Sequence, residues 1–389
     1  MLKWGEPRTD FYFGDKVGQK DAPKTVLVHD WLNGMRGGER CLELLAGEYP
    51  SAPVYTLLYR PELVSEAIRA HDVHVSGLSR LPGFRDRYRW FLPLFPTAIE
   101  AFRLPEDVRL VVSTSHCVAK GIRPPKGARH LCYCFTPMRY AWGLREDYFP
   151  SRLQRALLGP ALDRLKRWDR AASDRVDRFV AISRCVRERI ERSYGRDAAI
   201  VYPPVNVAFH TPDPDAPAGS HDGYDLVVSA LVPYKRIDLA VRAYAASGHP
   251  LKIAGSGSEE ASLRALAAGA PNIEFVGHPD DAGVRQLYRR CRFLVFPGLE
   301  DFGIVPVEAQ ACGKPVIAYG EGGILDTVRD RRTGLFFGAQ TPEALADAVE
   351  RAAAMSWDPA EIRANAVRFS PERFLDGIRR ETARLLERR

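Results

Sequence analysis

Short apolar runs recur along the second half of the chain, and a helical pattern follows each one. The runs lie near residues 225–231, 251–254, 273–276, 292–296, 315–319 and 334–337. Repeated strand–helix units of this length predict a parallel, doubly wound sheet. The first half alternates in the same way, with strands expected at residues 25–29, 54–59, 110–113, 130–135 and 178–183. We therefore expect an α/β protein with two Rossmann-like domains, which 389 residues can accommodate.

Composition sets the expected domain boundaries. Residues 1–23 are a polar leader without the apolar segment of a signal peptide. Residues 24–205 form the first domain, and residues 206–223, rich in Pro, Asp, Gly and Ser, form a linker. Residues 224–369 form the second domain, and residues 370–389 form a final basic helix.

Net charge and cysteine content limit the expected binding partners and the expected cellular compartment. The net charge of +7 suits phosphate-bearing substrates or an anionic membrane face. No module that interleaves aromatic and basic residues is present, which argues against a nucleic-acid partner. The seven cysteines include Cys132 and Cys134, but no matching pair for zinc. With no apolar run of about 20 residues, we expect a cytoplasmic protein with reduced thiols.

A basic stretch leads into aromatic and aliphatic residues between residues 80 and 102. It contains Arg80, Arg85, Arg87 and Arg89. Such a stretch can dock on an anionic membrane face from the cytoplasmic side. It can equally be a core helix that is preceded by a solvent-exposed basic segment. The sequence leaves both interpretations open.

Two carboxylates flank a predicted helix start in the second half. The strand ending at Phe296 is followed by a loop with Glu300 and Gly303, and then by a helix with Pro306 in its first turn and Glu308 close behind. First-turn amides can bind an anion or a sugar hydroxyl, and carboxylates suit paired hydroxyls. A Glu near a helix start also complements the helix dipole, but that does not explain the loop.

Basic and glycine-rich turns follow the neighbouring strands. Lys235 and Arg236 lie in the first turn of the second domain and could neutralise a diphosphate. Gly255 and Gly257, and then Gly277, follow the next two strands and would allow close backbone approach to a nucleotide.

In the first half, Gly37 and Gly38 lie in a glycine-rich loop between the first strand and a predicted helix that ends near Glu48. Their loop lacks G-x-G-x-x-G, and the strand near residues 54–59 ends in Tyr-Arg, which argues against a nicotinamide cofactor. His116 follows a buried strand in a turn rich in Ser and Thr. Phe135 ends the next strand and Arg139 follows it, where Arg139 is either a ligand of an acceptor phosphate or an ordinary surface arginine.

Seven residues separate Glu300 from Glu308, and Phe-Gly stands shortly after the first of these two acids. This pattern resembles the donor motif of the retaining nucleotide-sugar glycosyltransferases of family 4. These enzymes have the GT-B fold, in which two Rossmann-like domains face a cleft and the final helices, here residues 370–389, cross back to the first domain. The resemblance implies catalysis without a divalent metal. We therefore interpret the D-x-D sequence at residues 213–215 as a solvated part of the linker.

The resemblance also implies roles for the candidate residues. Glu300 and the backbone of Phe302, Gly303 and Ile304 would orient the hexose, and Glu308 would bind the ribose. Four candidates would contact the donor phosphates: Gly37, Gly38, Lys235 and Arg236. His116 would contact the sugar near its reacting carbon.

Residues 136–142, Thr-Pro-Met-Arg-Tyr-Ala-Trp, resemble mannosyltransferases of bacterial surface-polysaccharide assembly. This resemblance implies GDP-mannose as donor and a glycan or lipid-linked acceptor near Phe135 and Arg139. A UDP-sugar such as UDP-glucose is the alternative donor. Phe135 stands where histidine is common, and Ala230 where arginine is common. A sugar-nucleotide epimerase of the same fold and a catalytically silent sugar-nucleotide-binding subunit remain as alternatives.

Overall fold

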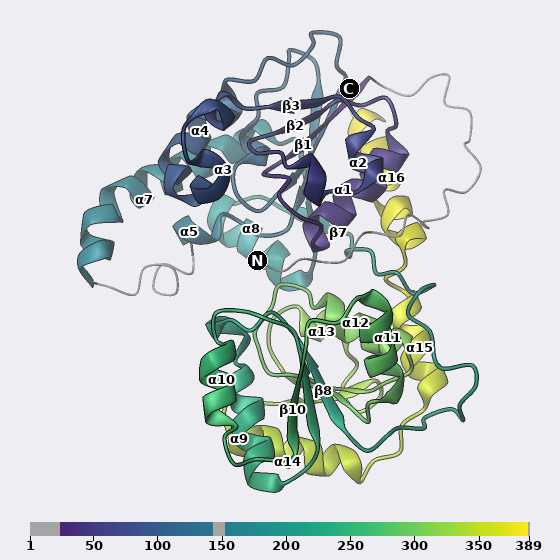
Figure 1. Cartoon of the computed structure of the whole chain (residues 1–389). Helices are drawn as coiled ribbons and strands as arrows, with labels where there is room; N and C mark the ends of the chain where they lie inside the picture. The colour runs from purple at the N-terminus through teal and green to yellow at the C-terminus, as the bar shows by residue number, and fades with distance from the viewer. Residues whose placement is uncertain (1–23, 143–151, 388–389) are drawn as a thin grey trace. The chain divides into compact units, whose positions relative to one another are not determined.

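A computed structural model describes residues 24–142 and 152–387. The predicted polar leader, residues 1–23, lies outside the described residues. The chain divides into two units (Figure 1). Among the described residues, 203–373 belong to the C-terminal unit, and 24–142, 152–202 and 374–387 belong to the N-terminal unit.

The N-terminal unit is built on a seven-stranded sheet in the order β3-β2-β1-β4-β5-β6-β7, and every neighbouring pair is parallel. Its strands are β1 (Thr25–His29), β2 (Val54–Thr56), β3 (Val73–Val75), β4 (Leu110–Ser115), β5 (Arg129–Cys134), β6 (Arg178–Ala181) and β7 (Ala198–Ile200). The sequence did not predict β3 and β7, because three-residue edge strands carry little apolar pattern.

The C-terminal unit repeats this architecture with six strands in the order β10-β9-β8-β11-β12-β13, again all parallel. The strands are β8 (Asp225–Val228), β9 (Leu251–Ala254), β10 (Ile273–Gly277), β11 (Leu294–Phe296), β12 (Val316–Tyr319) and β13 (Gly334–Phe337). All six predicted strands are present. The predicted fold class, two Rossmann-like parallel sheets, is confirmed.

Helices connect the strands in both units. The N-terminal unit has α1 (Gly37–Glu48), α2 (Glu66–Arg69), α3 (Phe84–Arg87), α4 (Phe95–Glu100), α5 (Arg139–Trp142), α7 (Arg152–Ala172), α8 (Arg184–Tyr194) and α16 (Pro371–Glu387). It also has the 3₁₀ helices η1 (Pro61–Leu63), η2 (Gly77–Arg80), η3 (Tyr88–Leu94), η4 (Ala119–Gly121) and η5 (Ser173–Arg175). The C-terminal unit has η6 (Pro233–Lys235), α9 (Ile237–Ser247), α10 (Glu260–Leu266), α11 (Asp281–Arg290), α12 (Ile304–Ala311), α13 (Ile324–Thr327), α14 (Pro342–Ala353) and α15 (Pro359–Val367).

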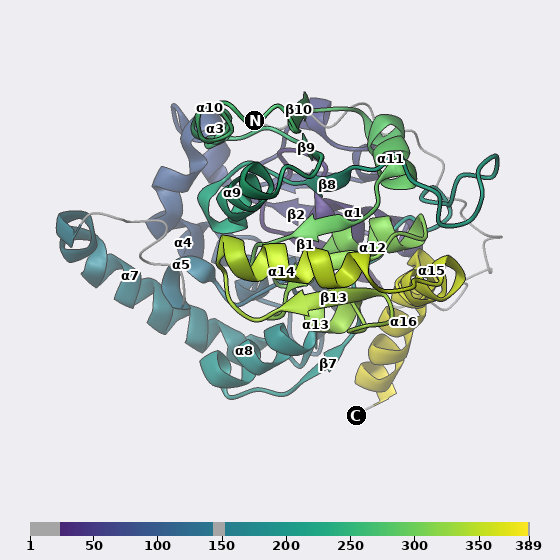
Figure 2. The same cartoon turned by 90° about the horizontal axis from the view of Figure 1, so that it is seen from below.

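Alternating strand residues divide the core of the C-terminal unit into two layers. Val227 and Ile317 pack with α9 and α14, which Figure 2 shows across one face of the sheet. Leu226 and Val316 pack with α11 and α12 on the opposite face. Because successive side chains of a strand point to opposite faces, strands buried on both faces read as continuous apolar runs.

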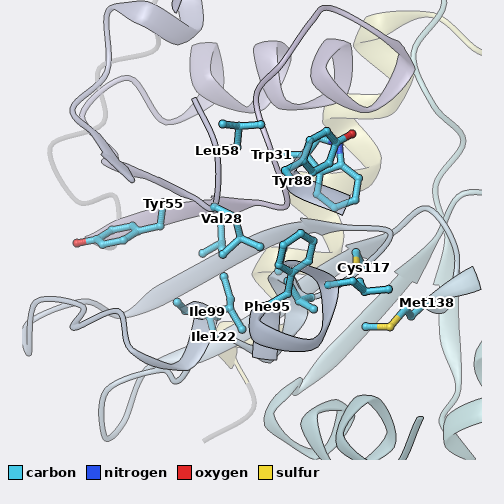
Figure 3. Packing of buried hydrophobic residues seen from close by; sticks show 14 of the residues in the cluster. Val28, Trp31, Tyr55, Leu58, Tyr88, Phe95, Ile99, Cys117, Ile122 and Met138 are labelled. Carbon is cyan, nitrogen blue, oxygen red and sulfur yellow. The ribbon is translucent and has the colours of Figure 1, made fainter. Parts of the chain in front are cut away.

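In the N-terminal unit, β1 and β2 face a cluster formed by the segment from η3 to α4 (Figure 3). Val28 and Tyr55 come from the strands, and Tyr88, Phe95 and Ile99 come from η3 and α4. The inner side of the predicted 80–102 segment is therefore part of the core.

The last helix, α16, packs on the N-terminal unit, so the chain returns to its first sheet as the GT-B resemblance implied. Phe374 meets the ring of Tyr133 at 5.3 Å, and Arg178 binds Glu381. At Gly377 an added Cβ would lie 2.7 Å from a methyl carbon of Val201. The small residue lets the helix approach β7's end closely.

The predicted linker, residues 206–223, begins inside the C-terminal unit rather than as a free connection. The Arg289 side chain donates to the Thr211 carbonyl at 2.8 Å, and Arg363 donates to the His210 carbonyl at 3.0 Å. Asp215 is exposed and Asp213 is half-buried, so both are accessible to solvent, in keeping with the predicted solvated loop.

Candidate functional site

In each sheet, the order in which successive strands are added reverses at one point. This point lies between β1 and β4 in the N-terminal unit and between β8 and β11 in the C-terminal unit. In open parallel sheets, ligands bind at the carboxyl ends of the strands beside such a switch point. His116 directly follows β4, Lys235 follows β8 and Glu300 follows β11. The three residues predicted as catalytic therefore all lie at the expected edge of their own sheet.

In the C-terminal unit, Lys235 and Glu300 form an ion pair. Their side chains are only 15% and 24% exposed, respectively. The two loops that carry them touch through the backbone, since a Cβ added to Gly298 would lie 2.9 Å from the Lys235 Cα. Beside the pair, Tyr234 and Leu299 are exposed, which leaves apolar surface next to these charges.

Arg236 lies next to Lys235 but has a different partner. Its guanidinium Nε donates to Asp238 Oδ1 at 3.0 Å. Its φ of +53° is in the left-handed region that residues with a Cβ seldom adopt. The turn therefore holds Arg236 beside the predicted diphosphate site with its charge shared by Asp238.

The amino end of α12 begins at Gly303, whose φ is +93°. Glycine adopts this backbone conformation without strain. Phe302 is buried and packs on the ring of Phe369 at 5.5 Å, so only its backbone is available to a ligand. Ile304 is the first residue of α12 and is half-buried. First-turn amides here lack partners inside the helix and can bind polar ligand groups.

Glu308 is held from two sides. The Tyr288 hydroxyl donates to Glu308 Oε2 at 2.8 Å, and His210 Nε2 lies 3.6 Å from Oε1. Burial, followed by the charge of Glu308, raises the pKa of Tyr288 well above its usual value. The hydroxyl therefore remains a donor, and the Glu308 carboxylate is kept in place while still partly exposed.

The two predicted glycine turns lie at the ends of β9 and β10. The Gly255 amide donates to the Gly277 carbonyl at 2.6 Å. A Cβ added to Gly255 would lie 1.8 Å from the Ser229 carbonyl oxygen, and one added to Gly257 would lie 2.1 Å from the Leu231 oxygen. Close packing between these loops accounts for Gly255 and Gly257, and their contact with a nucleotide stays a prediction.

In the N-terminal unit, His116, Phe135 and Gly38 come together. The His116 and Phe135 rings lie 6.3 Å apart, and a Cβ added to Gly38 would meet the Phe135 ring at 3.3 Å. Gly37 and Gly38 are the first two residues of α1. Arg139 is half-buried and opens α5, close behind Phe135 in the chain.

Three polar residues at the site were not predicted from the sequence. Asp30 bonds His116, whereas His210 and Tyr288 surround Glu308. Asp30 could have been predicted as a site residue, because it is an acidic residue directly after the first buried strand. No local pattern marks His210, in the linker, or Tyr288, inside an amphipathic helix.

Comparison with known proteins identifies both parts of the chain. Residues 35–209 match the family described as Glycosyltransferase Family 4, and residues 218–369 match Glycosyl transferases group 1. The chain belongs to these glycosyltransferase families.

Two named relatives are 30% and 32% identical to this glycosyltransferase over the aligned residues. The D-inositol 3-phosphate glycosyltransferase of Mycobacteroides abscessus is 30% identical over 72% of this chain and 60% of its own. The GDP-mannose-dependent alpha-(1-6)-phosphatidylinositol monomannoside mannosyltransferase of Mycolicibacterium smegmatis is 32% identical over 45% of this chain and 54% of its own. The chain spans about half to three-fifths of the length of the curated relatives it matches.

Solved structures with the GT-B fold resemble the whole chain. Sucrose-phosphate synthase from Thermosynechococcus elongatus superposes with a TM-score of 0.69 at 18% identity, covering 93% of this chain and 99% of that one. Anabaena HepE in complex with UDP gives a TM-score of 0.67 at 17% identity, covering 92% and 100%. At such identities the likeness establishes the fold.

Within residues 24–142 and 152–387, no cluster of three or more His, Cys, Asp or Glu side chains could hold a metal ion. No helix in this same part of the chain combines the length and apolar character needed to cross a membrane.

The buried His210 predicts a pH-dependent stability of the C-terminal unit. Burial lowers the pKa of His210 from 6.5 to about 4. Between pH 6.5 and about 4, His210 is therefore protonated in the unfolded chain but neutral in the folded unit. The free energy of unfolding falls by about 1.4 kcal/mol for each pH unit as the pH decreases through this range. We expect His210→Gln to remove this dependence, measured by urea unfolding followed through hydrogen exchange of β8.

The exposed His249 provides the control, because His249→Gln should leave the slope of stability against pH unchanged. An equal slope in wild type and His210→Gln would show that His210 is not the responsible group.

Proposed function

We propose that this protein is a retaining glycosyltransferase that moves mannose from GDP-mannose to a glycan or lipid-linked saccharide in the cytoplasm. Relatives named as GDP-mannose-dependent mannosyltransferases support the donor. A UDP-sugar such as UDP-glucose is the second candidate, since HepE has been crystallised with UDP-glucose. Each is a donor with a diphosphate that the enzyme has to neutralise.

The observation that carries the proposal is the Lys235–Glu300 pair at the β8/β11 switch point. The ammonium group of Lys235 and the carboxylate of Glu300 neutralise each other. A donor diphosphate would replace Glu300 as the partner of Lys235, because phosphate oxygens form strong charge-assisted hydrogen bonds with an ammonium group. The exchange would free the Glu300 carboxylate to accept hydrogen bonds from hexose hydroxyls.

Other groups would complete the donor site. The amino end of α12 at Gly303 would stabilise the charge that develops on the leaving diphosphate, and Arg236 would assist. Glu308, held by Tyr288, would accept hydrogen bonds from the ribose hydroxyls. Because these groups supply positive charge themselves, we propose a reaction that needs no divalent metal.

Retention would follow from a reaction on one face of the sugar. The bond between the anomeric carbon and the diphosphate oxygen breaks, and the acceptor oxygen bonds to the same face. The leaving diphosphate takes the acceptor's proton, so no protein nucleophile is required. His116 would contact the hexose near the anomeric carbon, and Phe135 and Arg139 would lie on the acceptor side.

The test is an assay with radiolabelled GDP-mannose and UDP-glucose, each with and without a lipid extract as acceptor, in the presence and absence of EDTA. Nucleotide release that requires the acceptor and survives EDTA supports the proposal. A changed sugar without acceptor would favour an epimerase instead. Binding without any turnover would favour a silent binding subunit.

Glu308→Gln is expected to weaken donor binding. The substitution removes the charge of an acceptor in a buried polar contact, a loss of about 1.5–3 kcal/mol, or roughly 10- to 150-fold in donor KM. Glu321→Gln is the matched control, because exposed Glu321 also accepts a hydrogen bond from a tyrosine, Tyr319, at 2.7 Å. Unchanged donor KM and kcat in Glu308→Gln would remove Glu308 from the site.

We also propose that the exposed side of residues 80–94 contacts an anionic membrane surface. Trp90 is 80% exposed, and Leu81 and Leu94 are 40% and 45% exposed. In the 3₁₀ helix η3, Trp90 and Pro93 are three residues apart and share a face, and both are exposed. Tyr88 and Phe91 lie on another face, with Tyr88 in the core and Phe91 packed against it.

Positive charge surrounds these apolar residues. Arg80, Arg85, Arg87 and Arg89 are exposed, and the guanidinium of Arg87 lies 5.8 Å from the centre of the Trp90 ring. The one acid in this stretch, Asp86, is paired with Arg60. Tryptophan with arginine favours the headgroup region of an anionic bilayer, which would supply a lipid-linked acceptor.

Arg87→Gln with Arg89→Gln should weaken binding to vesicles made of equal parts phosphatidylcholine and phosphatidylglycerol by roughly 30-fold, at about 1 kcal/mol per arginine. Trp90→Ser should weaken binding to the same vesicles by removing apolar contact. Co-sedimentation measures both. Arg264→Gln in the C-terminal unit is the control, and equal binding by all variants would contradict the proposed surface.

A further inference from the structure

Asp30 is a fully buried carboxylate at the switch point of the N-terminal sheet. It directly follows β1 and accepts four backbone hydrogen bonds from the turn after β4. Oδ2 accepts from the amides of His116 and Cys117 at 2.7 and 2.9 Å. Oδ1 accepts from the amides of Val118 and Ala119, each at 2.7 Å.

The same carboxylate also reaches the side chain of His116. The distance from Asp30 Oδ2 to His116 Nδ1 is 3.0 Å. The Trp31 ring meets the His116 ring edge-on, with centres 4.4 Å apart. The His116 ring is therefore restrained by a hydrogen bond and by packing, although a third of its side chain is exposed.

Electrostatics keep Asp30 ionised. Burial by itself raises the pKa of a carboxyl group. The charge that His116 carries when it is protonated, together with the hydrogen bonds from its side chain and backbone, outweighs burial, and the pKa of Asp30 lies well below its usual value. An ionised carboxylate only accepts hydrogen bonds. The contact with His116 therefore requires a proton on Nδ1.

We propose that Asp30 is a positioning residue that fixes the proton of neutral His116 at Nδ1 and leaves Nε2 to accept a hydrogen bond from a sugar hydroxyl. The link to turnover rests on the proposed function. The carboxylate that shapes the turn also sets the donor and acceptor nitrogens of the ring. Asparagine has one acceptor oxygen and cannot reproduce this, because its NH₂ group would face amide donors.

The first test needs no substrate and no substitution of Asp30. ¹⁵N-histidine NMR of the unaltered chain, with the His116 signals assigned by their loss in His116→Gln, reports which ring nitrogen carries the proton. We expect the Nδ1–H tautomer of the neutral ring. An Nε2–H tautomer would overturn the proposal, whether or not the protein transfers sugar.

The second test is a double-mutant cycle on turnover. Asp30→Asn and His116→Gln should each lower kcat by about 10- to 100-fold, the loss of a charge-assisted hydrogen bond, with donor KM changed far less. Combined, they should be no worse than the poorer single variant, because Asp30 acts through His116. Full additivity would overturn the proposal in favour of a purely structural role for the turn.

Asp107→Asn, at an exposed carboxylate paired with Lys24, is the control and should keep wild-type turnover. Wild-type turnover in His116→Gln would overturn the role of His116 in the proposed reaction, and with it the link from Asp30 to turnover. The tautomer measurement still decides the Asp30 contact in that case, so the two failures are distinguishable.

Discussion

At the switch point of each sheet, a charged side chain in the loop after one strand forms hydrogen bonds or an ion pair with the loop after the neighbouring strand. In the N-terminal unit, Asp30 after β1 binds the turn after β4. In the C-terminal unit, Lys235 after β8 binds Glu300 after β11. Parallel strands bring their carboxyl ends to one edge, and only at the switch point do the adjoining connections leave towards opposite faces. A charge placed there can join loops that are far apart in the sequence.

The two charge contacts differ in burial, and that difference suits different tasks. Asp30 has no exposed surface and accepts four amides, so removing it would leave several buried donors unsatisfied. Lys235 and Glu300 remain partly exposed, and each has one charged partner that a ligand can replace. A fixed contact holds a turn in shape, whereas an exchangeable one is suited to a substrate that carries its own negative charge.

The segment from η3 to α4 shows how one element can serve both the core and the surface. Tyr88 and Phe95 pack beneath it against β1 and β2 (Figure 3), while Trp90 and its arginines remain on the outside. The two interpretations that the sequence left open for this segment therefore do not exclude each other. Burial of one face is a structural fact, and membrane contact by the other is the proposal that the exposed residues support.

Much of the fold and the outline of the site could be predicted from the sequence, because both depend on local patterns. Runs buried on both faces marked the central strands, and the spacing of Glu300, Gly303, Pro306 and Glu308 marked the strand–loop–helix at β11 and α12. That spacing also led to the family, which comparison with known proteins confirms. The short edge strands carried too little pattern to be recognised.

Only the tertiary structure could pair Asp30 with His116, 86 residues apart, or bring Tyr288 and His210 to Glu308. A hydrogen bond requires its donor and acceptor atoms to be placed to within a few tenths of an ångström, and the chain's local periodicity does not relate these groups to one another. The sequence by itself determined which strands are buried and which residues follow them. The order of the strands in each sheet decided which of those residues meet, because loops distant in the chain become neighbours only when their strands pair.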